Sequence, residues 1–503
     1  MRDLRQPTRY IARIPFDPAI SRGRSLLLQR SLRSSTQLAA RWRSTAADLH
    51  AAVEKPLRML VPSITRIAAN VCARVVFVGL ALAPPSIVNA QTTAPIEKEE
   101  EYPNLLDGTL SGKGDQEDAD ILRRGWMRFP TLLDPWFSRK EQWRTEYGLT
   151  IGGSYGLLWQ TYSESQLGQN NAVGGKFAFN VGYQLFRRRQ PDALWFELVI
   201  EDRRAVGTDL PPVLGGLAAG SLSLTTATWG AFDIGVTQAY LRQNLANNRF
   251  QYAVGKVMAP TFFHAYPFFD DNRQFFNQGF ATLLPAPLRG FGAVAAFYPI
   301  EGSRFYVQSG MYTLNSNDTG FTVHDFFTKA EHFYHLDLGL TGLARSPLPL
   351  QARGPMDVNN VNISGWYRNA QENGTPEAVG IAVNANYVVR GDYMVFARGG
   401  WGNGSLFRGF VTTGVGWRPR PAPADLFGVG FSWARPTERT DLAPVPVPGL
   451  DSLRDQSTLE TFYRFHVTPN LALTPDLQLI VHPSLTPTVN QLWAIGFRTR
   501  ITF

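Results

Sequence analysis

The chain has 503 residues, of which 18% are charged and 12% aromatic, with 45 glycines and 34 prolines. This composition differs from the charge-rich mixture of large cytosolic proteins, and a mean hydropathy of −0.16 excludes a bundle of transmembrane helices, each of which needs about 20 mostly apolar residues. Residues 1–90 hold 14 Lys or Arg and 4 Asp or Glu, so the net charge of +8 comes from this leader, and nothing in the remainder indicates nucleic-acid binding.

The first ninety residues are interpreted as a misassigned start followed by a secretory signal peptide. Residues 59–90 begin with Met and contain basic residues, an apolar run over 75–82 and a small residue, Ala90, after which cleavage is expected. The upstream stretch, residues 1–58, is rich in Arg and Ser, which is also typical of an organellar transit peptide. Untranslated leader sequence is the favoured interpretation.

Residues 91–146 are predicted to form a periplasmic N-terminal extension. The chain looks irregular to about Arg144 and carries two acidic patches, so a solvated linker leading into the first strand is favoured over a partner-binding segment. The only cysteine, Cys72, falls within the signal peptide. A mature chain that begins at Gln91 therefore has no disulfide, thiolate metal site or cysteine nucleophile.

From Gly148 onward, hydrophobic and polar residues alternate with a period of two, which is typical of a strand with unlike faces. The last strand, residues 491–503, shows this most clearly. One face carries Trp, Ile, Phe, Thr, Ile and the terminal Phe503, while the other carries Ala, Gly, two Arg and Thr. The first face suits lipid and the second water.

The same pattern predicts an all-β fold for residues 147–503, a transmembrane antiparallel β-barrel of about 16 strands. The strands are expected to start near Gly148, Lys176, Ala193, Asp233, Arg249, Gly290, Arg304, His332, Val358, Ala378, Asp392, Gly409, Asp425, Ser457, Asn470 and Gln491. Connections after strands 2, 4, 6, 10, 12 and 14 are short and those after strands 3, 5, 7 and 13 are long, as in outer-membrane barrels. The link over residues 342–357 is too long for this scheme and leaves a missed strand possible.

A soluble β-sandwich would also alternate, but its outward positions would be charged and polar rather than aromatic and aliphatic. The outward residues here are apolar, which favours a membrane barrel. Phe503 at the end of the outer face adds to this interpretation, because bacterial barrel assembly recognises a terminal aromatic residue. It is predicted to be the assembly signal.

Three segments resemble the carbohydrate-selective porins of the OprB type. These are residues 459–503, which begin LETFYRFHVTPNLALTPDLQLIVHPS, residues 253–277 with their Gly-Lys, Phe-Phe and Gln-Phe-Phe-Asn elements, and residues 415–433. The likeness covers most of residues 145–503. It implies a sixteen-stranded outer-membrane pore that admits sugars, with an inward-folded loop that narrows the lumen. Ala253 and Gln238 stand where the family tends to place arginine and glutamate, so a changed or relaxed substrate preference is possible.

Sugar selectivity requires aromatic faces for the CH faces of a pyranose and polar groups that exchange hydrogen bonds with its hydroxyls. Residues 262–280 supply both types and form the predicted constriction. The alternative is an outer loop whose aromatic side chains pack on one another and on the rim. The candidate contacts in this segment are Phe262, Phe263, Phe268, Phe269, Asp271, Asn272, Arg273, Phe275 and Phe276.

Further candidates face the lumen from the predicted strands, although each alone is more often a solvated wall residue than a ligand contact. They are Trp195, Glu197, Glu201, Arg242, Trp366, Arg368, Arg398 and Arg464. Together they predict an aromatic lining of mixed charge.

These patterns predict a porin for passive diffusion of monosaccharides such as glucose into the periplasm, with no enzymatic activity, cofactor or metal. The expected partners are sugars and small polar solutes, outer-membrane lipid and the barrel assembly machinery, and the protein would be a monomer or a homotrimer. The alternative function is a barrel enzyme or an adhesin. Residues 152–156 have the spacing of a nucleophile elbow, but they lie in an alternating strand with no helix after it. His332 and His335 would lie on opposite faces of a strand and so would not bind one metal.

Overall fold

The structure is a computed structural model that describes residues 102–106, 133–188, 190, 192–345, 355–420, 422, 424–438 and 453–503. All of them belong to one compact unit, residues 67–503. The predicted leader and signal peptide, residues 1–58 and 59–90, lie outside the described residues.

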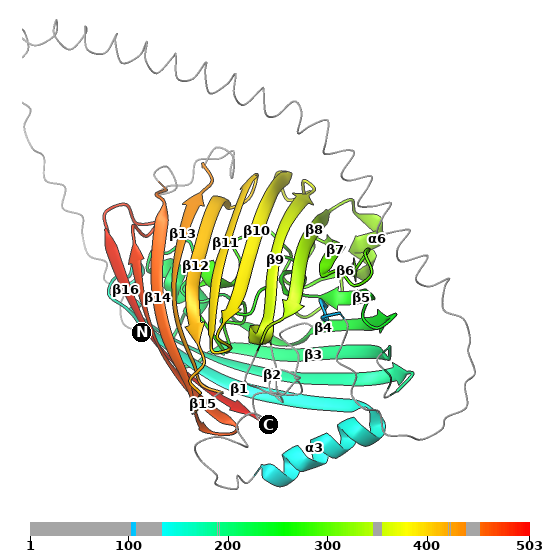
Figure 1. Cartoon of the computed structure of the whole chain (residues 1–503). Helices are drawn as coiled ribbons and strands as arrows, with labels where there is room; N and C mark the ends of the chain where they lie inside the picture. Colours follow the sequence, from blue (N-terminus) through cyan, green and yellow to red (C-terminus); the bar gives the residue numbers. More distant parts are fainter. Residues whose placement is uncertain are drawn as a thin grey trace, which may run out of the picture. The chain divides into compact units, whose positions relative to one another are not determined.

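Sixteen strands form a closed barrel in which each strand pairs antiparallel with its neighbour in the sequence and β16 closes onto β1 (Figure 1). The strands are β1 (Leu149–Tyr162), β2 (Asn171–Phe186), β3 (Leu194–Ala205), β4 (Phe232–Leu245), β5 (Phe250–Val257), β6 (Gly290–Phe297), β7 (Phe305–Thr313), β8 (His332–Leu343), β9 (Val358–Arg368), β10 (Ala378–Val389), β11 (Tyr393–Asn403), β12 (Phe407–Trp417), β13 (Leu426–Pro436), β14 (Gln456–Thr468), β15 (Leu471–Val481) and β16 (Gln491–Thr502). The predicted fold class is thereby confirmed.

Fifteen of the sixteen strands start within two residues of the predicted position. The exception is β2, which begins at Asn171 rather than at Lys176, because its first residues include adjacent glycines and show no alternation. Residues 346–354 of the long link over residues 342–357 lie outside the described residues, but no strand of the barrel is missing between β8 and β9. β8 and β9 pair directly, with Leu343 opposite Val358.

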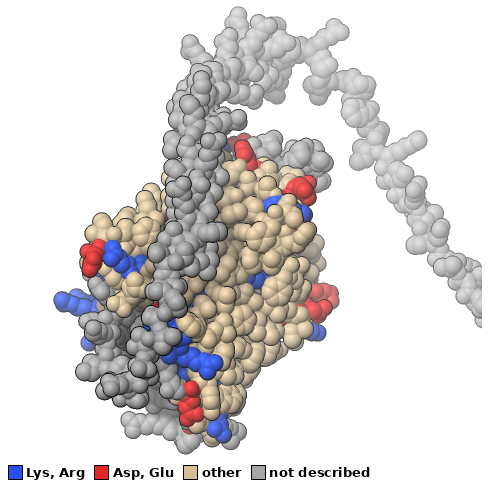
Figure 2. All heavy atoms as spheres, turned by 90° about the vertical axis from the view of Figure 1, so that its right-hand side faces the viewer, with Lys and Arg blue, Asp and Glu red and all other residues tan. Residues whose placement is uncertain are grey.

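Side chains alternate across the wall as the sequence predicts. Outward positions of β16 such as Trp493 and Ile495 are exposed, whereas the inward Ala494 and Arg498 are buried. Figure 2 shows one face of the molecule, on which Lys, Arg, Asp and Glu form scattered patches in a larger area of other residues. Because every strand is paired, no backbone edge is left open to an apolar surrounding.

Most connections at one end of the barrel are short, and we call this the short-turn end. Arg390 and Gly391 form the turn between β10 and β11 with φ of 55° and 80°, the left-handed conformation of tight hairpins. The opposite end, the long-loop end, carries most of the longer connections. These include α4 (Pro212–Ala218), the 3-10 turn η1 (Ala259–Thr261), α5 (Gln278–Ala281) and α6 (Val323–Thr328), while η3 (Pro355–Asp357) precedes β9.

One part of the predicted linker is helical. Helix α3 (Asp134–Tyr147) precedes β1 and ends where Gly148 adopts a φ of 67° and donates its N–H to the carbonyl of Arg144. Trp136 and Trp143 pack edge to face with ring centroids 5.6 Å apart. The sequence analysis predicted irregular chain up to about Arg144, but residues 134–147 form a capped helix. Among the described residues, no helix combines the length and apolar character required to cross a membrane.

Candidate functional site

The connection between β5 and β6, residues 258–289, folds into the lumen, and we call it the constriction loop. A buried loop needs partners for its backbone groups, and lumen-facing wall residues supply them. Gln308 of β7 donates to the carbonyl of Phe262 (2.6 Å), and Thr412 of β12 donates to that of Gly279 (2.9 Å). Wall residues on two well-separated strands thus hold the loop within the barrel.

Two buried arginines hold the loop most extensively. Arg398 of β11 donates to the carbonyls of Phe280 (3.2 Å), Ala281 (3.1 Å) and His264 (2.7 Å), and its guanidinium lies 3.8 Å from the ring centroid of Tyr266. The guanidinium of Arg398 therefore binds the backbone of the loop, whereas the sequence analysis predicted that it contacts sugar.

On the other side of the lumen, Arg498 of β16 performs the same task. It donates to the carbonyls of Asp271 (2.6 Å) and Gln274 (3.2 Å) and stacks on Phe276 with 4.4 Å to the ring centroid. Glu460 of β14 accepts from the backbone N–H groups of Phe276 and Asn277. Charge-assisted bonds of this kind are about twice as strong as neutral ones.

The aromatic rings of the constriction loop pack mainly against the wall. A Cβ added to Gly416 would overlap the ring of Phe268, and one added to Gly430 would overlap that of Phe280. Phe275 stacks on Phe280 at 4.2 Å. This placement differs from the expected one, in which these rings would face the sugar, because inward glycines leave room for them at the wall.

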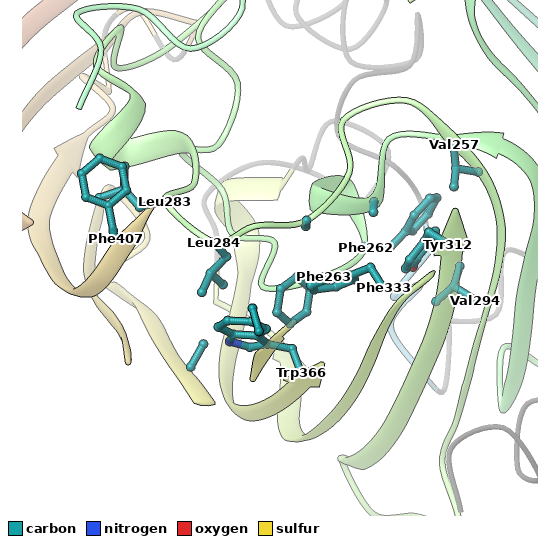
Figure 3. Packing of buried hydrophobic residues seen from close by; sticks show 14 of the residues in the cluster. Val257, Phe262, Phe263, Leu283, Leu284, Val294, Tyr312, Phe333, Trp366 and Phe407 are labelled. Atoms are coloured by element: carbon teal, nitrogen blue, oxygen red, sulfur yellow. The ribbon is translucent and has the colours of Figure 1, made fainter. Parts of the chain in front are cut away.

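Phe262 and Phe263 are also buried, in a cluster beneath the loop that Figure 3 shows from close by. Phe263 packs on Phe333 at 5.1 Å, and Phe333 stacks on Trp366 at 6.2 Å. Trp366 was expected to line the pore, but it supports the base of the loop instead.

A second connection, the β3–β4 loop (residues 206–231), also enters the lumen, which the sequence did not predict. Gln160 of β1 and Gln478 of β15 both donate to the carbonyl of Thr225. Trp229 lies over Gly156, where a Cβ would come within 2.8 Å of its ring. Polar, small residues of this stretch lack a periodic pattern, so no sequence signal marked it.

The two inward loops meet at Asp271. Its carboxylate accepts from the backbone N–H groups of Ala227 (3.0 Å) and Thr228 (2.6 Å) and from the Thr228 hydroxyl. The ammonium of Lys176 donates to the same hydroxyl at 2.9 Å. The loops and the wall are therefore joined by one polar network.

The space left between these loops and one side of the wall is the candidate passage. Strands β1 to β4 and β16 and both inward loops line it, with polar groups of either charge beside aromatic rings. The lining includes Ser154, Lys176, Asn180, Glu201, Arg203, Thr228, Trp229, Gln238, Phe269, Asp270, Asp271, Asn272, Arg273, Arg289 and Arg500.

Positive charge from the wall and from the constriction loop gathers around a single carboxylate in the passage. Glu201 lies 2.9 Å from Arg203, 3.4 Å from Lys176 and 3.9 Å from Arg289. The constriction loop brings acidic groups to the same space, and burial raises the pKa of Asp270, an effect that the charge of Arg273 opposes. A solute in the passage thus meets donors and acceptors together.

The structure separates the predicted site residues into those on the passage and those elsewhere. Phe269, Asp271, Asn272, Arg273 and Glu201 line it.

A second group lies nearer the short-turn end, where Arg242 forms an ion pair with Glu197 at 2.8 Å and stacks on Trp195 at 5.0 Å. Arg464 also binds near that end, donating to the carbonyl of Ala424 at 3.0 Å.

Arg368 ties two connections at the long-loop end, since it donates to the carbonyls of Pro376 (2.8 Å) and Gly404 (2.6 Å). It supports the rim of the barrel. The terminal Phe503 lies at the barrel seam, where it exchanges backbone hydrogen bonds with Gly153 and stacks on Phe177 at 6.2 Å. Its role as an assembly signal stays a prediction.

Several lining residues were missed although a signal existed. Arg203 continues the same face of β3 as Glu197 and Glu201, one step beyond the predicted set. Lys176 and Arg500 also occupy inward positions of period-two strands. Arg289 could not be placed in this way, because it belongs to a loop.

The structure keeps apart His332 and His335, the two histidines that the sequence analysis considered as a metal pair. His335 lies between Tyr312 (3.1 Å) and Asp337 (3.2 Å), and all three side chains are buried beneath the constriction loop. His332 lies on the opposite face of β8 and contacts the carbonyl of Phe326. Residues 152–156 form part of β1. Within the part of the chain that the structure describes, no cluster of three metal-ligating side chains occurs.

A closed barrel of sixteen antiparallel strands, with an apolar exterior and a polar passage narrowed by inward loops, defines a transmembrane porin-type barrel. Residues 351–503, which contain β9 to β16, match the family described as carbohydrate-selective porin, OprB family. The resemblance predicted from the sequence is confirmed over these residues.

The fold is also similar to that of solved porins. A high-pH structure of Pseudomonas putida OprB matches with a TM-score of 0.56 and 14% identity, covering 73% of this chain and 97% of that chain. The low-pH structure of the same protein gives a TM-score of 0.43 at 14% identity, with 74% and 98% covered. A triple mutant of Rhodopseudomonas blastica porin gives 0.39 at 9% identity, with 71% and 100% covered. Comparison with curated proteins gives no significant match.

Proposed function

We propose that this protein is an outer-membrane porin through which small polar solutes, with a preference for monosaccharides such as glucose, diffuse passively into the periplasm. The observation that carries the proposal is the composition of the passage. Glu201, its three cationic neighbours, the polar side of the constriction loop and the rings of Trp229 and Phe269 surround one continuous space.

The chemistry of a sugar fits such a lining. Each hydroxyl both donates and accepts a hydrogen bond, so it can exchange partners between Glu201 and Arg203 on one side and Asn272 on the other. The apolar CH face of a pyranose can rest on Trp229 or Phe269. These contacts are individually weak, which allows the solute to leave again.

The exterior of the barrel supports a location in the outer membrane. Apolar side chains such as Ile381, Val411 and Ile495 are exposed at outward positions and suit outer-membrane lipid. We propose that the signal peptide is removed after Ala90 and that the barrel assembly machinery recognises Phe503. The protein would act as a monomer or a homotrimer.

Liposome swelling with a panel of sugars tests the function. Proteoliposomes should swell faster in monosaccharides than in larger oligosaccharides, and Glu201→Gln should reduce the advantage of the monosaccharide because it removes the charge and replaces one of the two acceptor oxygens with an NH2 donor. Asp202→Asn is the matched control, since this neighbouring carboxylate lies on the outer face and pairs with Arg204.

An enzyme or adhesin would give no solute flux, so absence of swelling together with absence of single-channel conductance would reject the porin. Equal effects of Glu201→Gln and Asp202→Asn would reject the assignment of the passage.

A further inference from the structure

A short piece of the N-terminal extension, Tyr102 to Leu106, lies at the short-turn end of the lumen. Its backbone is bound by lumen residues of the β4–β5 and β6–β7 region. The carbonyl of Tyr102 accepts from Asn248 (3.0 Å), and the carbonyl of Pro103 accepts from Gln251 (3.0 Å) and from the hydroxyl of Tyr298 (2.9 Å).

Gln251 of β5 is the centre of this contact. Its amide oxygen accepts from the N–H groups of Leu105 (2.7 Å) and Leu106 (3.3 Å), while its amide nitrogen donates to Pro103. The side chain is completely buried. Without the segment, these amide groups would lose three hydrogen-bond partners, and only water could replace them.

Side chains of the segment add specific packing. The ring of Tyr102 lies 4.7 Å from that of Tyr298, and its hydroxyl accepts from the N–H of Gly302 at 2.9 Å. Leu106 belongs to the same buried cluster as Ala253 and Phe262. Tyr102 and Leu106 are 2% and 1% exposed, respectively.

The segment therefore packs beneath the constriction loop, against the part of the wall that has the shortest strands, β5 to β7. In Figure 1 it is the short blue piece beside β4 and β5. Its contacts link two adjacent turns of the short-turn end, because Asn248 belongs to the β4–β5 turn and Gly302 to the β6–β7 turn.

We propose that residues 102–106 are an internal ligand of the barrel, bound in a peptide site formed by Asn248, Gln251, Tyr298 and the turn at Gly302, and that this ligand narrows the short-turn mouth of the pore. The site recognises an extended peptide that offers carbonyl and N–H groups to the amide of Gln251 and one aromatic ring to Tyr298. The effect on conductance rests on the proposed channel function, whereas the binding of the segment does not.

Cysteine labelling of the full-length protein tests the binding. In a Cys72→Ser background, Leu106→Cys should react with a water-soluble maleimide at least about tenfold more slowly than Ser138→Cys, an exposed position of α3. Adding Tyr102→Ala should remove most of this protection, while Tyr147→Ala, which truncates an exposed tyrosine of the same extension, should leave it intact.

Planar-bilayer recordings then test the effect on the pore. Tyr102→Ala should raise single-channel conductance, and Tyr147→Ala should leave it at the parent value, with both variants showing the same heat-dependent mobility as the parent. Equal labelling of Leu106→Cys and Ser138→Cys would overturn the binding. If Tyr102→Ala abolishes the protection of Leu106→Cys but leaves the single-channel conductance unchanged, the segment does not narrow the pore. If every variant conducts, the proposed porin function is supported whatever the role of the segment.

Discussion

Replacement of Arg398 by methionine should release the constriction loop from its wall while leaving the barrel closed. Methionine keeps much of the length of the side chain but donates no hydrogen bond, so the carbonyls of Phe280, Ala281 and His264 each lose a charged donor. Such bonds contribute about 1.5–3 kcal/mol each. Water that enters the lumen can donate some of the lost hydrogen bonds. We therefore expect the free energy of loop opening to fall by about 3 kcal/mol.

A cysteine at Ala281, which is 5% exposed, reports this opening. If labelling proceeds through the open state, a change of about 3 kcal/mol accelerates it roughly 10²-fold. Arg398→Lys, which retains the charge but cannot reach all three carbonyls at once, should lie in between. Arg390→Met, an exposed turn position, is the control. Labelling of Arg398→Met within threefold of the parent rate, in protein with unchanged mobility, would refute the role of Arg398 as a clamp.

Three further outcomes are expected. Gly416→Leu should lower the folded fraction in a gel-mobility assay, because the leucine side chain would overlap the buried ring of Phe268 and overpacking costs about 1–3 kcal/mol. Gly365→Leu, on the open outer face, should leave the folded fraction unchanged. Equal folded fractions of the two variants would contradict the packing of Phe268 on Gly416. Glu201→Gln should shift the reversal potential in a KCl gradient toward anion selectivity. One unit charge acts on an ion 5 Å away in water with about 0.8 kcal/mol, which corresponds to roughly a fourfold change in local ion concentration. An unchanged reversal potential would place Glu201 outside the ion path. N-terminal sequencing of membrane-inserted protein should begin at Gln91, and a sequence that starts at Met1 would overturn the predicted cleavage.

The sequence predicts the wall of this barrel well because the wall obeys a local rule. Residues on a strand alternate between lipid and lumen, so every strand except β2 could be located to within two residues from periodicity. The same rule fails at the start of β2, where Gly174 and Gly175 supply no alternation. Helix α3 was missed because its side chains are mostly polar, and its boundary is set by the cap at Gly148.

The inside of the barrel depends on long-range contacts that no local pattern reveals. The aromatic residues of the constriction loop could be found, but their orientation depends on where inward glycines leave space, as Gly416 does for Phe268. A charged lumen residue has the same sequence signature whether it binds solute, as expected for Arg398, or loop backbone, as observed. The β3–β4 loop escaped prediction because its inward course depends on distant partners such as Gln478.

The anchors of the constriction loop have a consequence for the order of folding. The loop follows β5, yet Glu460 and Arg498 lie on β14 and β16, near the end of the chain. Loop closure over such a distance in sequence is slow relative to hairpin formation, and these contacts cannot form before the last strands have paired. The contacts of the loop with β7, β11 and β12 do not require β16, whereas those with Arg498 do, so the loop reaches its full set of contacts only after the last strand has joined the wall.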